Sequence, residues 1–197
     1  MHTYSYHGIR PVISPLAYVH PQAVIIGNVE IGKEVYIGPG AVLRGDFGKI
    51  IVKDGANVQE NCVIHVFPKI ETILEESAHI GHGAIIHSGH IGKNCLVGMN
   101  AVVMDKAEIG DECIIGALSF VPANFKCEPR KLIVGSPARI IKDVSDEMIQ
   151  WKTKGTGIYQ TLAREAREAI QPCEPFSEFV EQKPNKDLNY DIWDDLK

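Results

Sequence analysis

The sequence lacks the features of nucleic-acid-binding and membrane-spanning proteins. Its 20 Lys and Arg residues are outnumbered by 25 Asp and Glu, and no concentrated basic stripe is present to bind a phosphate backbone. No apolar run approaches the ~20 residues needed to cross a bilayer. The first residues lack the charged start and apolar core of a signal peptide. We therefore expect neither nucleic acid nor membrane as a partner.

Cysteine is scarce and has no spacing that suggests pairing. The chain has 5 cysteines in 197 residues, at positions 62, 95, 113, 127 and 173, without a CxxC motif. An odd number of scattered cysteines is typical of free thiols in a reducing compartment. We therefore predict a cytoplasmic protein, and the 45% hydrophobic and 23% charged content is that of a globular domain.

The sequence does contain a repeat of six residues over about a hundred positions. A smaller residue follows most of its large apolar residues by four places, as at Ala23, Val29 and Cys95, and Phe47 falls in the same position. A period of six fits neither an α-helix nor simple strand alternation, so it predicts an all-β solenoid with the large residues pointing inward. The large residues are Val19, Ile25, Ile31, Ile37, Leu43, Val52, Val58, Ile64, Leu74, Ile80, Ile91, Val97, Val103, Ile109, Ile115 and Val121.

Two departures from the repeat lie close together. Residues 67–72 interrupt the spacing directly after His65, which predicts a protruding loop. Ile80 and Ile91 are separated by eleven residues instead of twelve, so one hexad is shortened. Local irregularity in a regular scaffold is expected at functional sites.

The repeats stop after Val121, and the chain then predicts a covering helix. We expect a solenoid domain over residues 1–140 and a helix with a tail over residues 141–197. The helix is predicted over residues 145–152, with a pause at 155–157 and a continuation to 170. Its expected apolar stripe is Ile158, Leu162, Ala166 and Ala169. The tail, with scattered aromatics that include Tyr190 and Trp193, is expected to lie extended against a neighbour or to be partly disordered.

Histidines gather where the repeat is irregular. His65, His82 and His87 are candidate metal ligands, because imidazole is the commonest protein ligand for zinc and related metals. His82 and His87 flank a predicted corner, so their side chains leave different faces of the solenoid. One chain would then struggle to bring all three to one ion, whereas a neighbouring copy in a symmetric trimer could supply the missing ligand.

Residues 57–65 and 80–87 resemble the signature of the γ-class carbonic anhydrases, a hexapeptide-repeat family. The resemblance implies a left-handed parallel β-helix of triangular section and a homotrimer. It also implies one zinc, iron or cobalt ion per subunit interface. His65 and His87 would come from one chain and His82 from its neighbour.

Other segments are similar to the branch of phenylacetate-degradation and carnitine-operon proteins (PaaY and CaiE), which is associated with this metal site and with thioesterase action on CoA esters. They are residues 43–48, 98–105 and 134–138. The resemblance places Arg44 and Asp46 near bicarbonate at the interface, with Asn57 and Gln59 also matching the motif. Gln59 would contact or orient the metal-bound solvent.

The expected reaction uses metal-bound hydroxide to hydrate CO₂ or to hydrolyse an acyl-CoA thioester. The family's acidic proton-shuttle loop is abbreviated here, and Glu71 and Glu75 are only loose counterparts, which argues against fast CO₂ hydration. A CoA-dependent hexapeptide acyltransferase and a non-catalytic assembly protein remain as alternatives. Simpler roles are also open: wall-lining for His79 and His90, helix packing for Tyr159, turns for Glu60 and Asn61, and a salt bridge between subunits for Arg44 and Asp46.

Overall fold

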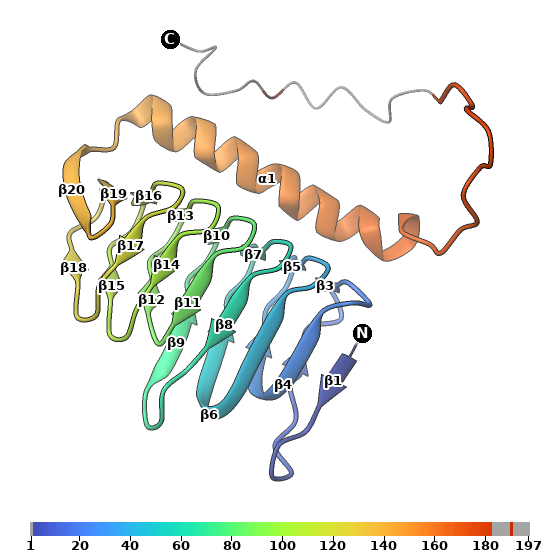
Figure 1. Ribbon diagram of the computed structural model, residues 1–197, viewed down its shortest axis with the longest axis horizontal. Coiled ribbons are helices and arrows are strands. Elements are labelled where there is room, and N and C mark those ends of the chain that lie inside the picture. The colour runs from blue at the N-terminus through green and yellow to red at the C-terminus, as the bar shows by residue number, and fades with distance from the viewer. Residues whose placement is uncertain (1, 183–189, 191–197) are drawn as a thin grey trace.

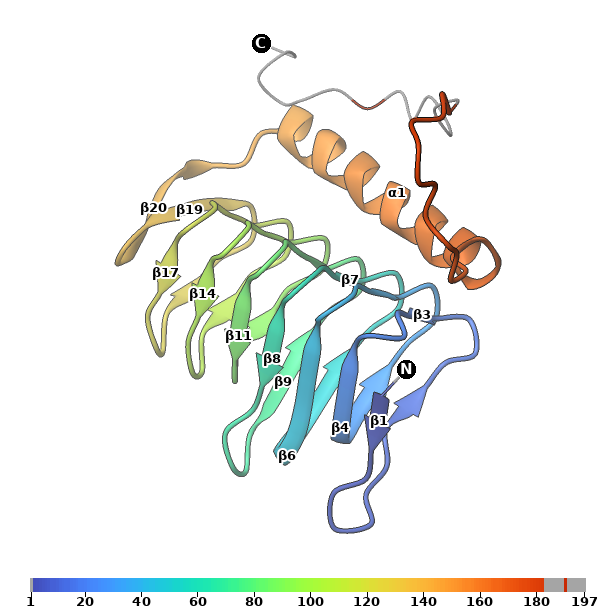
Figure 2. The same cartoon turned by 45° about the vertical axis from the view of Figure 1, so that its right-hand side comes forward.

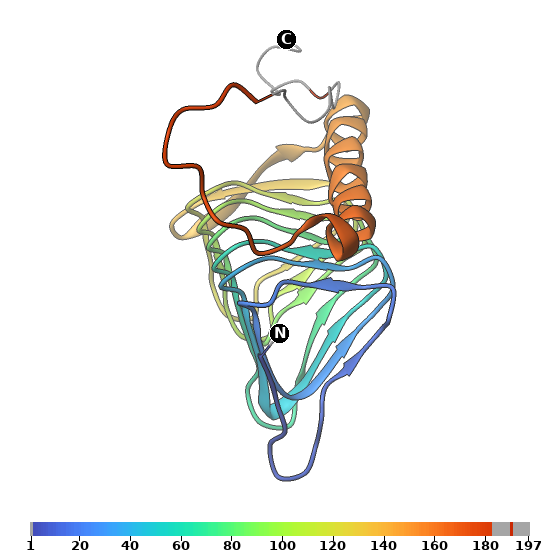
Figure 3. The ribbon, with the colours of Figure 1, turned by 90° about the vertical axis from the view of Figure 1, so that its right-hand side faces the viewer.

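The computed structural model describes residues 2–182 and Tyr190. Its body is a left-handed parallel β-helix of hexapeptide repeats, followed by one helix, α1 (Asp146–Ala169) (Figure 1). Seen from the end of the solenoid, the coils have a triangular outline (Figure 3). The predicted fold class is therefore confirmed.

Three sheet faces make up the triangle. The face that carries His65 and His87, here called the histidine face, contains β1 (His2–Tyr4), the first parts of β4 (Val24–Ile31) and β6 (Val42–Val52), β8 (Val63–His65), β11 (Ile85–His87), β14 (Val102–Val103) and β17 (Phe120–Val121). The second face contains β2 (Val12–Ile13), the last parts of β4 and β6, β9 (Glu71–Leu74), β12 (His90–Ile91), β15 (Glu108–Ile109) and β18 (Lys126–Cys127).

The third face lies under α1 and is here called the helix face (Figure 2). It contains β3 (Tyr18–Val19), β5 (Tyr36–Ile37), β7 (Asn57–Val58), β10 (His79–Ile80), β13 (Leu96–Val97), β16 (Ile114–Ile115), β19 (Lys131–Gly135) and β20 (Ala138–Asp143). All its pairs are parallel except the hairpin of β19 and β20 at the C-terminal end.

The core follows the six-residue repeat. Every large residue that the repeat places inside is buried except Val19, which is partly buried and packs against the core. Cys95 and Cys113 are buried and free, as their place among the small residues predicts. Phe47 is the exception, because its side chain is 53% exposed. It lies within β6, where this strand extends around the corner and shifts register against β4, so the expected small-residue position does not exist there.

Helix α1 corrects two predictions. It does not pause at residues 155–157 but runs unbroken from Asp146 to Ala169, capped by Ser145, whose hydroxyl accepts from the Met148 amide at 3.3 Å. The stripe that faces the solenoid includes Lys152, Gly155 and Thr156, whereas the predicted Ala169 is exposed.

Polar residues belong in this stripe because the corners of the solenoid present hydrogen-bonding groups to the helix. Lys152 Nζ donates to the Ser77 carbonyl at 2.7 Å and to Asn94 Oδ1 at 2.6 Å, and Gln160 Nε2 donates to the Gly55 carbonyl at 3.1 Å. These bonds offset the cost of the two glycines in the helix, about 1 kcal/mol each.

The tail is described only in part. Residues 171–182 have no helix or strand, and Tyr190 stacks on Trp151 with ring centroids 5.7 Å apart. Trp193 and the rest of the predicted tail after Tyr190 lie outside the described residues. The predicted division after residue 140 falls within β20. Over residues 2–182 and 190, no helix is long and apolar enough to cross a membrane.

Candidate metal centre

The fold brings His65 and His87 side by side. They are register partners at the ends of β8 and β11, although 22 residues separate them. The extra residues form the loop between β8 and β9, which protrudes beyond the corner and leaves the strand register intact (Figure 2). As a result, His65 Nδ1 and His87 Nε2 lie 3.1 Å apart.

A carboxylate holds the other nitrogen of each ring. His65 Nε2 lies 2.9 Å from Asp46 Oδ1, and His87 Nδ1 lies 2.6 Å from Asp105 Oδ1. A neutral imidazole donates through one nitrogen only, so the two nitrogens that face each other both carry lone pairs. Two lone pairs at this separation repel each other unless a proton or a cation lies between them.

This geometry suits a metal ion. Zinc–nitrogen bonds of about 2.0–2.1 Å in a tetrahedral site place two ligand nitrogens about 3.3 Å apart. Metal-bound histidines also characteristically donate their second N–H to a carboxylate, which fixes the ring orientation. The pair and its carboxylates therefore fit two ligands of such an ion. Zinc, iron and cobalt all accept imidazole.

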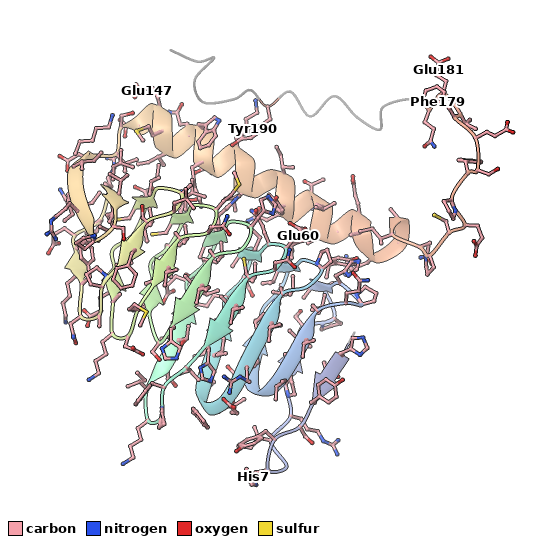
Figure 4. The ribbon with its side chains drawn as sticks, in the orientation of Figure 1. His7, Glu60, Glu147, Phe179, Glu181 and Tyr190 are labelled. Atoms are coloured by element: carbon pink, nitrogen blue, oxygen red, sulfur yellow. The ribbon has the colours of Figure 1, made fainter. Side chains whose placement is uncertain are left out.

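His82 lies elsewhere on the chain. It follows β10 at the corner between the helix face and the histidine face, and Glu60 Oε2 accepts from its Nδ1 at 2.5 Å. Figure 4 shows Glu60 at the edge of the solenoid below the helix. His82 precedes His87 by five residues, and the chain turns at residues 82–83 before β11 begins at Ile85. Across the described part of this chain, no group of three or more His, Cys, Asp or Glu residues is placed to hold a metal.

Each of the remaining predicted residues lies either near the histidine pair or near the corner that carries His82. Arg44 and Asp46 lie on the histidine face, where Asp46 Oδ2 accepts from Arg44 Nη1 of the same chain. Partial burial opposes ionisation of Asp46, but the hydrogen bonds from His65 and Arg44 outweigh it and hold the carboxyl pKa below its usual value. Asn57 and Gln59 lie on and just after β7, beside the corner that carries Glu60.

Sequence reasoning missed the two carboxylates Glu60 and Asp105. Glu60 was expected only to form a turn, yet its Oε2 also accepts a hydrogen bond from His82. Its Oε1 accepts from the Tyr36 hydroxyl at 2.9 Å. Asp105 follows His87 by 18 residues, which is one regular coil, so the repeat itself contained this signal. Glu60 precedes His82 by 22 residues, the same offset as that between His65 and His87.

Two phenylalanines were also missed as neighbours of the histidine pair. The Phe47 ring lies 5.6 Å from that of His65, and the Phe67 ring lies 6.3 Å from that of His87. Both side chains are more than half exposed, and the Arg44 guanidinium lies 5.9 Å from the Phe47 ring centroid. The two phenylalanine rings together place apolar surface at the edge of the candidate site.

The two glutamates considered as proton shuttles differ in their surroundings. Glu75 bonds Lys53 at 2.8 Å and His90 at 3.1 Å, both on the outer surface of the solenoid. Glu71 begins β9 and is exposed. Tyr159 packs as expected, with its ring 5.4 Å from Tyr36 and 5.2 Å from His79.

Known proteins match this chain over nearly its whole length. The family model described as bacterial transferase hexapeptide (six repeats) matches residues 10–45 and 90–123. The carnitine operon protein CaiE of Escherichia coli K12 is 45% identical over 192 residues, which cover 98% of both chains. The chain belongs to the hexapeptide-repeat family, in its CaiE branch. CaiE of Proteus sp. strain LE138 is 49% identical over 90% of each chain.

Two solved structures share this fold. One is the product of the BC4754 gene of Bacillus cereus, a candidate acetyltransferase, with a TM-score of 0.84 and 33% identity over 86% of this chain and 98% of its own. The other is a hexapeptide transferase family protein of Anaplasma phagocytophilum, with a TM-score of 0.80 and 34% identity over 83% of this chain and 96% of its own. The relatives support an enzyme of the hexapeptide-repeat family.

Proposed function

We propose that this protein is a metal-dependent enzyme of the γ-carbonic anhydrase type, assembled as a homotrimer. Each subunit interface would hold one zinc, iron or cobalt ion, bound by His65 and His87 of one copy and His82 of its neighbour. The carrying observation is the 3.1 Å approach of His65 Nδ1 to His87 Nε2, with Asp46 and Asp105 behind the rings. Glu60 orients His82 in the same manner.

The surface beside the histidine pair supports the proposal that a second copy of the chain packs on this face. The outward residues of successive strands form one apolar row along the histidine face, in register from strand to strand. Val63, Ile85 and Phe120 are 39%, 38% and 38% exposed in the single chain. A flat apolar row of this kind is typical of a subunit interface. The row consists of Val42, Val63, Ile85, Val102 and Phe120.

A bound divalent cation would supply Lewis acidity, which makes water acidic enough to lose a proton near neutral pH. The protein residues have separate tasks. Asp46, Asp105 and Glu60 hold the imidazole rings in place. Arg44 is the register partner of His65, and its guanidinium can bind the carboxylate or bicarbonate that forms.

The walls of the site favour an acyl-CoA thioester as substrate, with CO₂ as the second candidate. Phe47 and Phe67 offer apolar surface that an acyl group could contact and that CO₂ does not need. Glu75 is already bonded to Lys53 and His90, so it is a poor proton carrier for rapid CO₂ hydration. In hydrolysis, water attacks the thioester carbonyl, the C–S bond breaks, and a carboxylate and the CoA thiol are released.

A CoA-dependent acyltransferase is the alternative, favoured by the similarity to the Bacillus cereus candidate acetyltransferase. In that reaction a histidine would accept a proton from the acceptor amine or hydroxyl, and no metal would be needed. The two reactions differ in their response to chelation and in their need for an acceptor. A non-catalytic assembly protein would show neither reaction.

The test begins with protein purified without a histidine tag. Metal content, acyl-CoA hydrolysis and CO₂ hydration are measured for the wild type, for His82→Ala and for the surface control His90→Ala. We expect about one ion per chain in the wild type and the control, with ion and hydrolysis both lost in His82→Ala. Acyl transfer that persists after chelation and requires an acceptor would reject the proposal in favour of the alternative.

A further inference from the structure

His79 differs from the candidate ligands because no carboxylate of residues 2–182 is hydrogen-bonded to it. It lies on β10 of the helix face, between the solenoid and α1. Its Nδ1 is 3.3 Å from the Thr156 hydroxyl on α1, and its Nε2 is 2.6 Å from the Gln59 side-chain nitrogen. The Tyr159 ring packs edge-on against it at 5.2 Å.

The chemistry of these partners fixes the proton on His79. The Gln59 amide nitrogen can only donate, so His79 Nε2 must be the acceptor. The proton of the neutral ring then lies on Nδ1 and points to the Thr156 oxygen. Burial lowers the His79 pKa to about 3, and the positive charges of Lys152 and His82 act in the same direction.

The same bonds fix the orientation of Gln59. Its side-chain nitrogen carries two hydrogens, one directed to Asn57 Oδ1 at 3.0 Å and the other to His79 Nε2. Gln59 is 2% exposed, and the described residues make no hydrogen bond to its Oε1. Both hydrogens are thus occupied, and Oε1 is left as an acceptor beside the corner that carries Glu60 and His82.

We propose that His79 is a positioning residue, which holds Gln59 so that its Oε1 accepts a hydrogen bond from the reacting water or substrate. Thr156 fixes the His79 ring, so helix α1 takes part in building the site as well as covering the solenoid. This inference rests on the proposed function for the identity of the group that Oε1 meets. The hydrogen-bonded chain from Thr156 to Gln59 is a property of the fold itself.

The first test reads the His79 proton directly and needs neither metal nor substrate. Protein labelled with ¹⁵N-histidine is studied by long-range ¹H–¹⁵N NMR between pH 5 and 8, with His79→Gln to assign the signal. We expect a neutral His79 ring with a protonated Nδ1 and a bare Nε2 throughout this range, and a changed Nδ1 signal in Thr156→Val but not in Thr156→Ser. A protonated Nε2 at pH 7 would overturn the proposal.

The second test compares replacements at residue 79. Glutamine can place an oxygen near the position of Nε2 and accept from Gln59, whereas leucine cannot. We expect His79→Leu to lower kcat for hydrolysis about 10- to 100-fold with unchanged metal content, and His79→Gln to recover most of this loss. Equal losses in both variants, with intact metal and fold, would overturn the positioning role.

The two variants at residue 156, Thr156→Val and Thr156→Ser, keep this test decisive if His79→Leu does not fold. Thr156→Val should then show a smaller loss of kcat that Thr156→Ser does not, and identical kinetics for the two would contradict the role. A wild type that binds no metal and turns over no substrate would reject the proposed function. The His79 tautomer would still decide whether the chain from Thr156 to Gln59 exists.

Discussion

The histidine face and the helix face use the same side chain in opposite ways. On the histidine face, His65 and His87 are each backed by a carboxylate and turn their free nitrogens toward each other. On the helix face, His79 is covered by α1 and accepts a hydrogen bond from the Gln59 side-chain amide, and within the described part of the chain no carboxylate is bonded to it. A candidate ligand therefore has a carboxylate at one ring nitrogen, whereas the positioning residue has an amide donor there. Both kinds of histidine lie on short strands of the same repeat.

The largest expected effect is loss of the ion when the histidine pair is broken. His65→Ala leaves His87 without its partner, so metal content and hydrolysis should fall to background. The side chain lies outside the core, so the thermal midpoint of the metal-free protein should barely change. His90→Ala is the matched control, because His90 is exposed and contacts Glu75 on the second face. If His65→Ala retained a full metal complement, His65 would not be a ligand, and the distinction between the histidines of the two faces would be wrong.

The buried lysine of the helix face should make stability depend on pH. Burial lowers the Lys152 pKa from its ordinary 10.5 to about 7 in the folded protein. Between these values the unfolded chain binds more protons than the folded one, so the free energy of unfolding should rise with pH. The expected rise is about 1.4 kcal/mol per pH unit for one proton.

Lys152→Met keeps the length of the side chain and removes the titrating group. Urea unfolding at pH 7, 8, 9 and 10 should give a flatter pH profile for this variant than for the wild type. The exposed neighbour, Lys154→Met, serves as control and should leave the wild-type slope unchanged. Parallel profiles for the wild type and Lys152→Met would show that the charge of Lys152 is not destabilised by helix docking.

A smaller effect is expected from the carboxylates behind the ligands. Asp105→Asn replaces a charged acceptor of the His87 N–H with a neutral one, and should weaken metal binding about 10- to 100-fold. Competition with a chelator of known affinity measures this change. Asp111→Asn is the control, because Asp111 accepts from the backbone of Lys93 on another corner. Equal affinities for all three proteins would mean that Asp105 does not support a ligand.

The smallest effect concerns the apolar edge of the histidine face. Phe67→Ala should raise KM for an acyl-CoA about 5-fold while leaving CO₂ hydration unchanged, because only the acyl group gains from the apolar contact. Phe176→Ala, in the exposed tail, is the control. Dissociation of the trimer in Phe67→Ala, without a change in KM per assembled site, would assign this ring to the subunit contact instead.

The six-residue repeat predicted the solenoid and almost all of its core, because the narrow triangular interior accepts few types of side chain at each inward position. It also predicted that His82 would lie apart from His87, since a corner separates them. Glu60 escaped prediction because the loop after His65 lengthens the coil between Glu60 and His82 to 22 residues. Asp105 lies one regular coil of 18 residues after His87, so the repeat could have pointed to it. The helix was predicted to break at its glycines, although bonds from Lys152 and Gln160 to the solenoid hold it straight.

Complementation between two inactive variants tests most directly whether two copies share the site. In His65→Ala the pair is broken, and in His82→Ala the third ligand is missing, so each protein alone should lack metal and activity. A mixed trimer regains about one intact interface, between the pair of a His82→Ala chain and His82 of a His65→Ala chain. We predict that co-expression restores metal and hydrolysis. No recovery in purified mixed trimers, or full metal in either variant alone, would contradict a site shared between subunits.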